Sequence, residues 1–109
     1  TNDTPKKDIF AIALAMKAAG HRIIISSGRN MSQRATTLQQ LMSQGLAFDA
    51  IYMRSDTDYR QDYVVKQGML DKMRKDGFNP TMAVDDRQQV VDMWRDNGLT
   101  VLQVDDGDF

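Results

Sequence analysis

Two adjacent carboxylates, Asp85 and Asp86, stand where a short apolar stretch ends and a helical pattern begins. Paired carboxylate oxygens suit Mg2+, which takes one or two carboxylate ligands and keeps several waters. Aspartate is also a frequent cap at a helix N-terminus, so one carboxylate could cap the helix while the other is solvated. The pair by itself predicts either a magnesium site or a capped helix start.

A lysine and an aspartate share one face of an expected helix, because Lys66 follows Asp62 by four residues. One interpretation is a lysine that offsets the charge of a phosphate and is held in place by Asp62. The other is a surface ion pair, which contributes about 0.3–0.5 kcal/mol to a helix. The spacing alone favours the surface pair.

Ser27, Gly28 and Arg29 follow a run of three isoleucines at residues 23–25. Such an apolar run, bounded by small polar residues, is typical of a strand buried on both faces. Ligands of open α/β sheets bind just outside the carboxyl ends of the strands. A hydroxyl, a glycine and a guanidinium at that place could form an anion-binding cradle, or a turn with an exposed arginine.

Hydrophobic periodicity predicts the elements that must position these residues. A first helix is expected over about residues 5–19, with Thr4 as its cap before Pro5 and Gly20 as its left-handed end. The later helices are expected to stop at Gly45, Gly77 and Gly98. Strands are expected at residues 23–25, 48–53, 81–84 and 100–104. This alternation predicts a parallel sheet with crossover helices, in one doubly wound α/β domain over residues 1–109.

The composition excludes several classes of protein and of site. The 109 residues contain no cysteine, which excludes disulfides and thiolate metal sites and makes a cytoplasmic location the expectation. No run of about 18 apolar residues is present, so no association with a membrane is expected. A net charge of -1 gives no overall attraction to nucleic acid, so such binding would need a local basic patch.

Four stretches together resemble the haloacid dehalogenase-like (HAD) phosphohydrolases: residues 25–29, 60–66, 84–95 and 107–109. The third stretch is the longest and the most specific. Within this superfamily the chain is most similar to the 3′-phosphatase domain of phage-type polynucleotide kinase–phosphatases, which heal nucleic-acid ends. The resemblance implies a Rossmann-like, HAD-type parallel sheet with flanking helices, and Mg2+ as the cofactor.

The resemblance also assigns roles to individual residues. It implies binding of the phosphoryl group by Ser27 and Gly28, together with Arg29, which corresponds to an arginine needed for hydrolysis. The catalytic residues that it implies are Asp62, Lys66, Asp85 and Asp86. The last two of these match the motif that holds the metal.

The first motif of the family, Asp-x-Asp-Gly-Thr, is missing from these residues. Its first aspartate is the nucleophile that forms the aspartyl-phosphate, and its second is the general acid–base. Asp56 and Asp58 have the spacing but are followed by Tyr59 and Arg60. The motif ends the first, central strand, so the resemblance implies a sheet without that strand and with two unpaired edges. We expect the chain to be the carboxyl-terminal part of a longer phosphatase, whose upstream segment supplies the missing motif and the missing strand.

The expected function is Mg2+-dependent release of phosphate from the 3′ ends of DNA or RNA, within a polynucleotide kinase/phosphatase of nucleic-acid end repair. The expected partners are those 3′-phosphorylated ends and an upstream kinase domain or N-terminal segment, and a homo-oligomer is an open possibility. One alternative is a non-catalytic module that binds nucleic-acid ends or phosphate. Another is a HAD phosphatase for small nucleotide or sugar phosphates.

Overall fold

The structure, a computed structural model, describes residues 7–105 of the chain. The expected cap at Thr4 and Pro5 and the closing stretch 107–109 lie outside the described residues. The chain divides into two compact units, Thr1–Asp56 and Thr57–Phe109, called here the N-terminal and the C-terminal unit. Between residues 7 and 105, no helix combines the length and the apolar character needed to cross a membrane.

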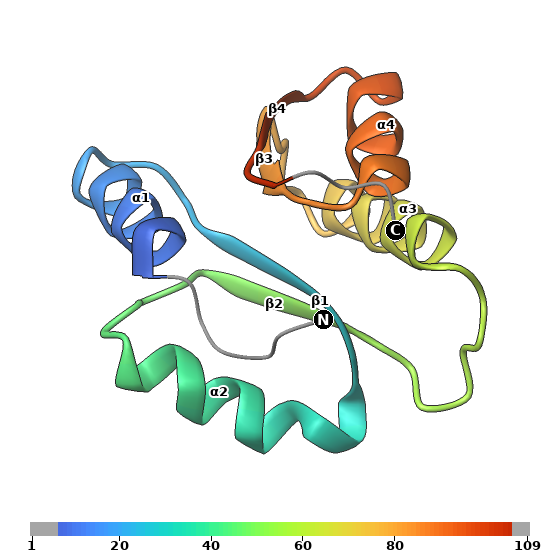
Figure 1. Cartoon of the computed structure of the whole chain (residues 1–109), viewed down its shortest axis with the longest axis horizontal. Helices are drawn as coiled ribbons and strands as arrows, with labels where there is room; N and C mark the ends of the chain where they lie inside the picture. Colours follow the sequence, from blue (N-terminus) through green and yellow to red (C-terminus); the bar gives the residue numbers. More distant parts are fainter. Residues whose placement is uncertain (1–6, 106–109) are drawn as a thin grey trace. The chain divides into compact units, whose positions relative to one another are not determined.

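The N-terminal unit is built on a pair of parallel strands, β1 (Ile24–Asn30) and β2 (Ala50–Arg54). Helix α1 (Lys7–Ala18) precedes β1, and a short 3-10 turn, η1 (Met31–Gln33), leads from β1 into helix α2 (Arg34–Ser43). Helix α2 is the crossover that lets β2 run parallel to β1 (Figure 1). Gly20 has a φ of 94°, which confirms the expected left-handed end of the first helix.

Asp49 fixes the entry to both strands. Its carboxylate accepts hydrogen bonds from Lys17 Nζ at 2.9 and 3.0 Å and from the backbone N–H of Ile23 at 2.7 Å. The Lys17 hydrogen bonds, followed by the Ile23 bond, hold the pKa of Asp49 below its ordinary value. These three residues, Lys17, Ile23 and Asp49, are called here the Asp49 clamp. The clamp connects the end of α1 to the residues that precede β1 and β2.

Strand β1 is longer and less buried than the apolar run predicts. It continues through Ser27, Gly28 and Arg29, and all seven of its residues are half-buried. The prediction of a strand buried on both faces, ending before Ser26, is therefore wrong. Among residues 7–105, β1 pairs with β2 alone, so it does not have the central position in which parallel strands are buried on both faces.

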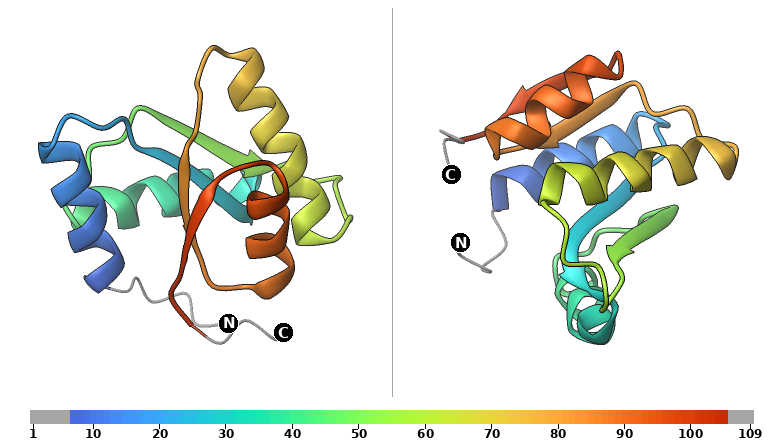
Figure 2. Two further views of the ribbon diagram at one scale, coloured as in Figure 1. Left: turned by 90° about the horizontal axis from the view of Figure 1, so that it is seen from above. Right: turned by 90° about the vertical axis from the view of Figure 1, so that its right-hand side faces the viewer.

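The C-terminal unit contains helix α3 (Asp62–Lys75), strand β3 (Met82–Asp85), helix α4 (Gln88–Asp96) and strand β4 (Thr100–Gln103). Strands β3 and β4 are parallel, and Asp85 lies opposite Gln103 at the end of the ladder. Helix α4 packs against α3 and against both strands (Figure 2). The left-handed Gly98, with a φ of 89°, ends α4 and turns the chain into β4.

The core of the C-terminal unit lies between α3, α4 and the strands. The largest fully buried side chains among its described residues are those of Leu70, Val90 and Val91. Apolar residues three and four apart on α3 and α4 form one stripe on each helix, and burial of these stripes drives the packing. The other buried apolar side chains of this unit, up to residue 105, are those of Val65, Met69, Met73, Met93, Trp94, Leu99 and Val101.

The expected α/β class, the parallel pairing and the order of elements are confirmed. The four described strands form two parallel pairs, β1 with β2 and β3 with β4, rather than one continuous ladder. Short parallel sheets with flanking helices agree with the expected HAD-type class of fold. The lack of a first central strand stays a prediction. That residues 1–109 constitute one domain stays a prediction.

Candidate functional site

The predicted site residues fall into two groups, one in each unit. Lys66, Asp62, Asp85 and Asp86 belong to the C-terminal unit. Ser27, Gly28 and Arg29 lie in β1 of the N-terminal unit. Each group has its own hydrogen-bond network within its unit.

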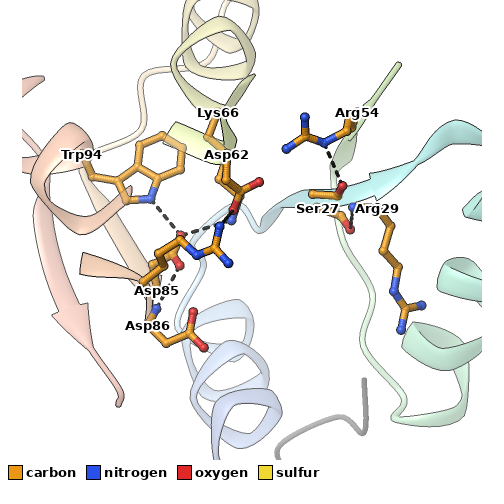
Figure 3. A network of polar contacts seen from close by, with 10 residues as sticks. Ser27, Arg29, Arg54, Asp62, Lys66, Asp85, Asp86 and Trp94 are labelled. Atoms are coloured by element: carbon orange, nitrogen blue, oxygen red, sulfur yellow. Dashed lines mark hydrogen bonds and ion pairs between the residues drawn. The ribbon is translucent and has the colours of Figure 1, made fainter. Parts of the chain in front are cut away.

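In the C-terminal unit, the centre of the network is a buried ion pair between Lys66 and Asp85 (Figure 3). Lys66 Nζ lies 3.3 Å from Asp85 Oδ2, and the two side chains are only 11% and 9% exposed. Lys66 is drawn inward because it lies on α3 beside Val65 and Met69, on the stripe that faces the core. Asp85 is the last residue of β3, so the strand delivers its carboxylate to the same place.

Asp85 accepts hydrogen bonds at both carboxylate oxygens. Trp94 Nε1 donates to Oδ2 at 3.1 Å, and the backbone N–H of Asp86 donates to Oδ1 at 2.8 Å. With Lys66 these make three donors, which compensate the loss of water around a nearly buried charge. The Asp85 side chain is consequently held in one orientation.

The expected pairing of Asp62 with Lys66 is wrong. The Lys66 ammonium pairs with Asp85, whereas Asp62 in the first turn of α3 lies 4.0 Å from Arg87 Nη1, just before α4. Residues one helical turn apart share a face, but a nearly buried carboxylate with fixed orientation is the better partner for a lysine that enters the core. The ion pairs therefore connect α3 to β3 and to the start of α4.

Asp86 differs from its neighbour. Its side chain is half-buried, and none of the residues 7–105 forms a hydrogen bond or an ion pair with its carboxylate. Neither Asp85 nor Asp86 caps α4, whose first cap residue, Arg87, makes no side-chain cap bond. The interpretation of the pair as a helix cap is therefore wrong.

The donor set fits a magnesium ion better at Asp86 than at Asp85. A Mg2+ ion can be held by one or two carboxylates while it keeps its waters, and the Asp86 oxygens are available for this. Both Asp85 oxygens already accept protein hydrogen bonds. Within the described range, no three carboxylate or histidine side chains gather as a complete metal cage. These residues would supply a part of a magnesium site.

In the N-terminal unit, Ser27, Gly28 and Arg29 are strand residues with a break in the pairing. Ser27 pairs with Met53 and Asn30 with Arg54, so Gly28 and Arg29 form an irregularity in β1. Ser27 Oγ accepts a hydrogen bond from the Arg29 backbone N–H at 3.1 Å. No described residue accepts the hydroxyl proton of Ser27, which leaves it available to an anion.

The side chain of Arg29 is engaged with helix α2. Its Nη1 donates to Gln40 Oε1 at 2.8 Å and to Thr37 Oγ1 at 3.4 Å. The alternative of an exposed arginine is wrong, because the Arg29 side chain is half-buried and hydrogen-bonded to a helix. The guanidinium therefore braces α2 against the end of β1. The role of Arg29 in phosphate binding stays a prediction.

Sequence reasoning missed two residues of these networks. Arg54 ends β2 and donates from Nε to the carbonyl oxygen of Gly28 at 3.1 Å, which brings a second guanidinium to the β1 irregularity (Figure 3). Its position after an apolar strand was the available signal, because parallel strands end at the same edge. Trp94 is a core residue with 3% exposure, and its indole N–H also orients Asp85.

The chain that contains these two networks is similar to known proteins. The family described as the polynucleotide kinase PNKP phosphatase domain matches residues 1–109. The chain is also similar to a chain of a solved Pnkp1/Rnl/Hen1 complex, with a TM-score of 0.88 and 31% identity over 95% of this chain and 36% of that one. A second solved Pnkp1/Rnl/Hen1 RNA repair complex contains a chain with a TM-score of 0.88 and 32% identity, covering 94% of this chain and 33% of that one.

This chain thus spans about a third of the length of those solved chains. The family match extends over both units and over every site residue considered above. Residues 1–109 belong to the family of polynucleotide kinase PNKP phosphatase domains.

Proposed function

We propose that the chain supplies the charge-offsetting, phosphate-binding and metal-holding part of a HAD-type polynucleotide 3′-phosphatase. The single observation that carries this proposal is the buried Lys66–Asp85 pair beside an Asp86 carboxylate without a described partner. Burial of the Lys66 ammonium costs free energy unless a counter-charge compensates it. Asp85 supplies that counter-charge, and its hydrogen bonds with Trp94 and the Asp86 N–H keep it, and therefore Lys66, in a fixed position. A fixed cation is what a phosphoryl-transfer site requires.

Each side chain has a distinct role in this proposal. Lys66 stabilises the negative charge that spreads over the phosphoryl oxygens, and Asp85 positions Lys66. Asp86 holds Mg2+, which when bound would act as a Lewis acid on the phosphoryl group. Asp62 acts through Arg87, its ion-pair partner, at the entrance to α3.

The β1 residues bind the phosphate in this proposal. The Ser27 hydroxyl donates to a phosphate oxygen, and the irregularity at Gly28 leaves backbone groups outside the regular ladder. Arg29 supports that segment through Gln40, and the guanidinium of Arg54 adds positive charge next to it. These roles keep the phosphate-binding assignment of Ser27, Gly28 and Arg29, with Arg29 acting chiefly by positioning.

The covalent chemistry requires a nucleophilic aspartate and a second aspartate for proton transfer, and the proposal places both outside residues 1–109. A Mg2+-dependent aspartyl-phosphate route would then run on a longer polypeptide, a kinase/phosphatase, with this chain as one HAD-like domain portion. The name of the matching family and the RNA repair complexes among the similar structures support a polynucleotide substrate, with 3′-phosphorylated DNA or RNA ends as the proposed class.

The test is phosphate release by the full-length protein from a 3′-phosphorylated oligonucleotide, with Mg2+ and with EDTA. Lys66→Met and Asp86→Asn should each lower kcat by about 100- to 1,000-fold, the loss typical for one electrostatic donor. Lys72→Met is the matched control, because Lys72 lies on the same helix with its side chain 66% exposed and should leave kcat unchanged. Melting curves must show that all three variants are folded.

The other outcomes separate the competing functions. Release of phosphate from small nucleotide or sugar phosphates but not from oligonucleotides would favour a small-molecule HAD phosphatase. Tight binding of oligonucleotide ends without any release would favour a binding module. Near-normal turnover by Lys66→Met and Asp86→Asn would refute the assigned roles.

A further inference from the structure

The most exposed large apolar side chain of the described residues is Tyr59, with 88% of its surface open to solvent. It lies in the segment that leads from β2 into α3 and belongs to the C-terminal unit. Within the described part of the chain, the ring makes no hydrogen bond and no ring contact. Single exposed apolar residues are common, so exposure alone does not indicate a function.

The backbone around Tyr59 is nevertheless held in place by its two neighbours. Arg60 and Asp58 form a bidentate pair, with Nε to Oδ1 at 2.8 Å and Nη2 to Oδ2 at 2.7 Å. The Arg60 backbone N–H also donates to Asp58 Oδ1 at 3.2 Å. This pairing raises the pKa of Arg60 above its ordinary value, as expected for a guanidinium bound to a carboxylate. Tyr59 is therefore the middle residue of an Asx turn, which is closed by the Asp58 side chain and not by a backbone hydrogen bond.

A turn that is closed by hydrogen bonds and carries an exposed aromatic ring is a suitable binding element. Tyrosine offers a large flat surface whose ordering costs little, because only two side-chain torsions must be fixed. Since Asp58 and Arg60 already bind each other, the turn is ordered before any ligand arrives, and the cost of binding falls accordingly.

The turn also lies close in the chain to the proposed charged site. Asp62, at the start of α3, is the third residue after Tyr59, and Lys66 follows Asp62 by one helical turn. Three extended residues span at most about 11 Å, so the Tyr59 Cα lies within that distance of the Asp62 Cα. A nucleotide whose phosphate is near Lys66 can therefore extend toward this turn.

We propose that Tyr59 is a stacking platform for a nucleobase at or next to the phosphorylated end of a polynucleotide. Single-stranded nucleic acids are bound by aromatic side chains that stack on unpaired bases, largely without regard to sequence. With a net charge of -1 over the whole chain, general electrostatic attraction is weak, which increases the need for such a contact. The inference rests on the proposed polynucleotide substrate.

The experiment compares two 3′-phosphorylated oligonucleotides with the full-length protein, one with normal bases and one with abasic residues at its last three positions. Tyr59→Ala should weaken binding of the normal oligonucleotide, and raise KM for it, by about 5- to 100-fold, the range for loss of one stacked base. The same variant should leave Kd and KM for the abasic oligonucleotide unchanged. Tyr59→Phe retains the ring and should behave as the wild type on both.

A control variant and a binding assay that does not depend on turnover complete the experiment. Met42→Ala removes another apolar side chain, 74% exposed, and should change neither ligand's affinity. Binding is followed by fluorescence anisotropy in EDTA, so that the result does not depend on turnover. If the wild type releases no phosphate but Tyr59→Ala still weakens binding to the normal oligonucleotide alone, the proposed phosphatase fails while the stacking platform stands. Unchanged binding by Tyr59→Ala, or an equal loss on both oligonucleotides, overturns the platform.

Discussion

Replacement of Lys66 by methionine tests the electrostatic centre of the C-terminal unit most directly. Methionine keeps an unbranched apolar side chain of similar length on the core face of α3 and removes the ammonium. Asp85, with its side chain 9% exposed, would then stay buried without its cationic partner. Removal of one partner of a buried ion pair typically costs about 3–5 kcal/mol of the free energy of unfolding.

The hydrogen bonds of Asp85 place the expected loss at the lower end of that range. The 3.3 Å separation is longer than the usual 2.7–2.9 Å of a charge-assisted bond. Trp94 Nε1 and the Asp86 N–H would also still bind the carboxylate in the variant. We therefore expect Lys66→Met to lower the free energy of unfolding by about 3 kcal/mol. At urea m values of about 1–3 kcal/mol per molar, the midpoint falls by roughly 1–3 M.

The assay is urea unfolding of the chain followed by the fluorescence of Trp94, its single tryptophan. Asp85→Asn alone should also be destabilising, because it leaves Lys66 without a counter-charge. The double variant should lose clearly less than the sum of the two single losses, by about 1–3 kcal/mol. Strict additivity, within about 0.5 kcal/mol, would refute the view that the two charges stabilise each other inside the protein.

Two further predictions concern other contacts of the same structure. Trp94→Phe removes the indole donor to the Asp85 carboxylate and should lower the free energy of unfolding by about 1.5–3 kcal/mol, as seen by circular dichroism in urea. Lys17→Met should destabilise the fold at neutral pH, because the folded-state pKa of Asp49 lies below its ordinary value. Such a group contributes stability above its unfolded pKa and loses it as the pH falls through the folded one, so the difference between Lys17→Met and wild type should shrink below about pH 4. A difference that stays constant down to pH 3 would contradict the clamp.

The C-terminal unit follows closely from local signals in the sequence. The stripe that includes Val90, Val91 and Trp94 has the helical period, Gly98 supplies the left-handed turn, and a short apolar strand ends at Asp85. Each of these signals acts within a few residues, and all of them favour the same structure. That agreement explains why the helices and strands of this unit could be predicted.

The partners of the charged residues could not be predicted from spacing. The interval between Asp62 and Lys66 describes one helix face, but it does not reveal that the stripe carrying Lys66 turns into the core toward a strand 19 residues further on. A long-range carboxylate with reinforcing donors then determines the pairing. Asp62 is left to pair with Arg87.

The course of β1 was missed for a different reason. An apolar run followed by Ser26 and Ser27 reads as a strand that ends, because polar residues usually mark the turn. The structure extends the strand to Asn30, since β2 supplies backbone partners opposite those residues and the two-stranded sheet does not demand apolar side chains there. The end of the strand is determined by its pairing partner β2, which lies too far along the chain to be part of the local sequence pattern.

The β3–α4–β4 segment joins two parallel strands through a single short helix, so its hydrogen-bonded and packed partners are close together along the chain. Contacts that are local in sequence close small loops, and chains rich in such contacts fold fast. We therefore expect this segment to form early in folding and α3 to pack on it afterwards. Asp85 and Trp94 would be in position first, and the docking of α3 would then bring Lys66 to the buried carboxylate of Asp85 and compensate its charge.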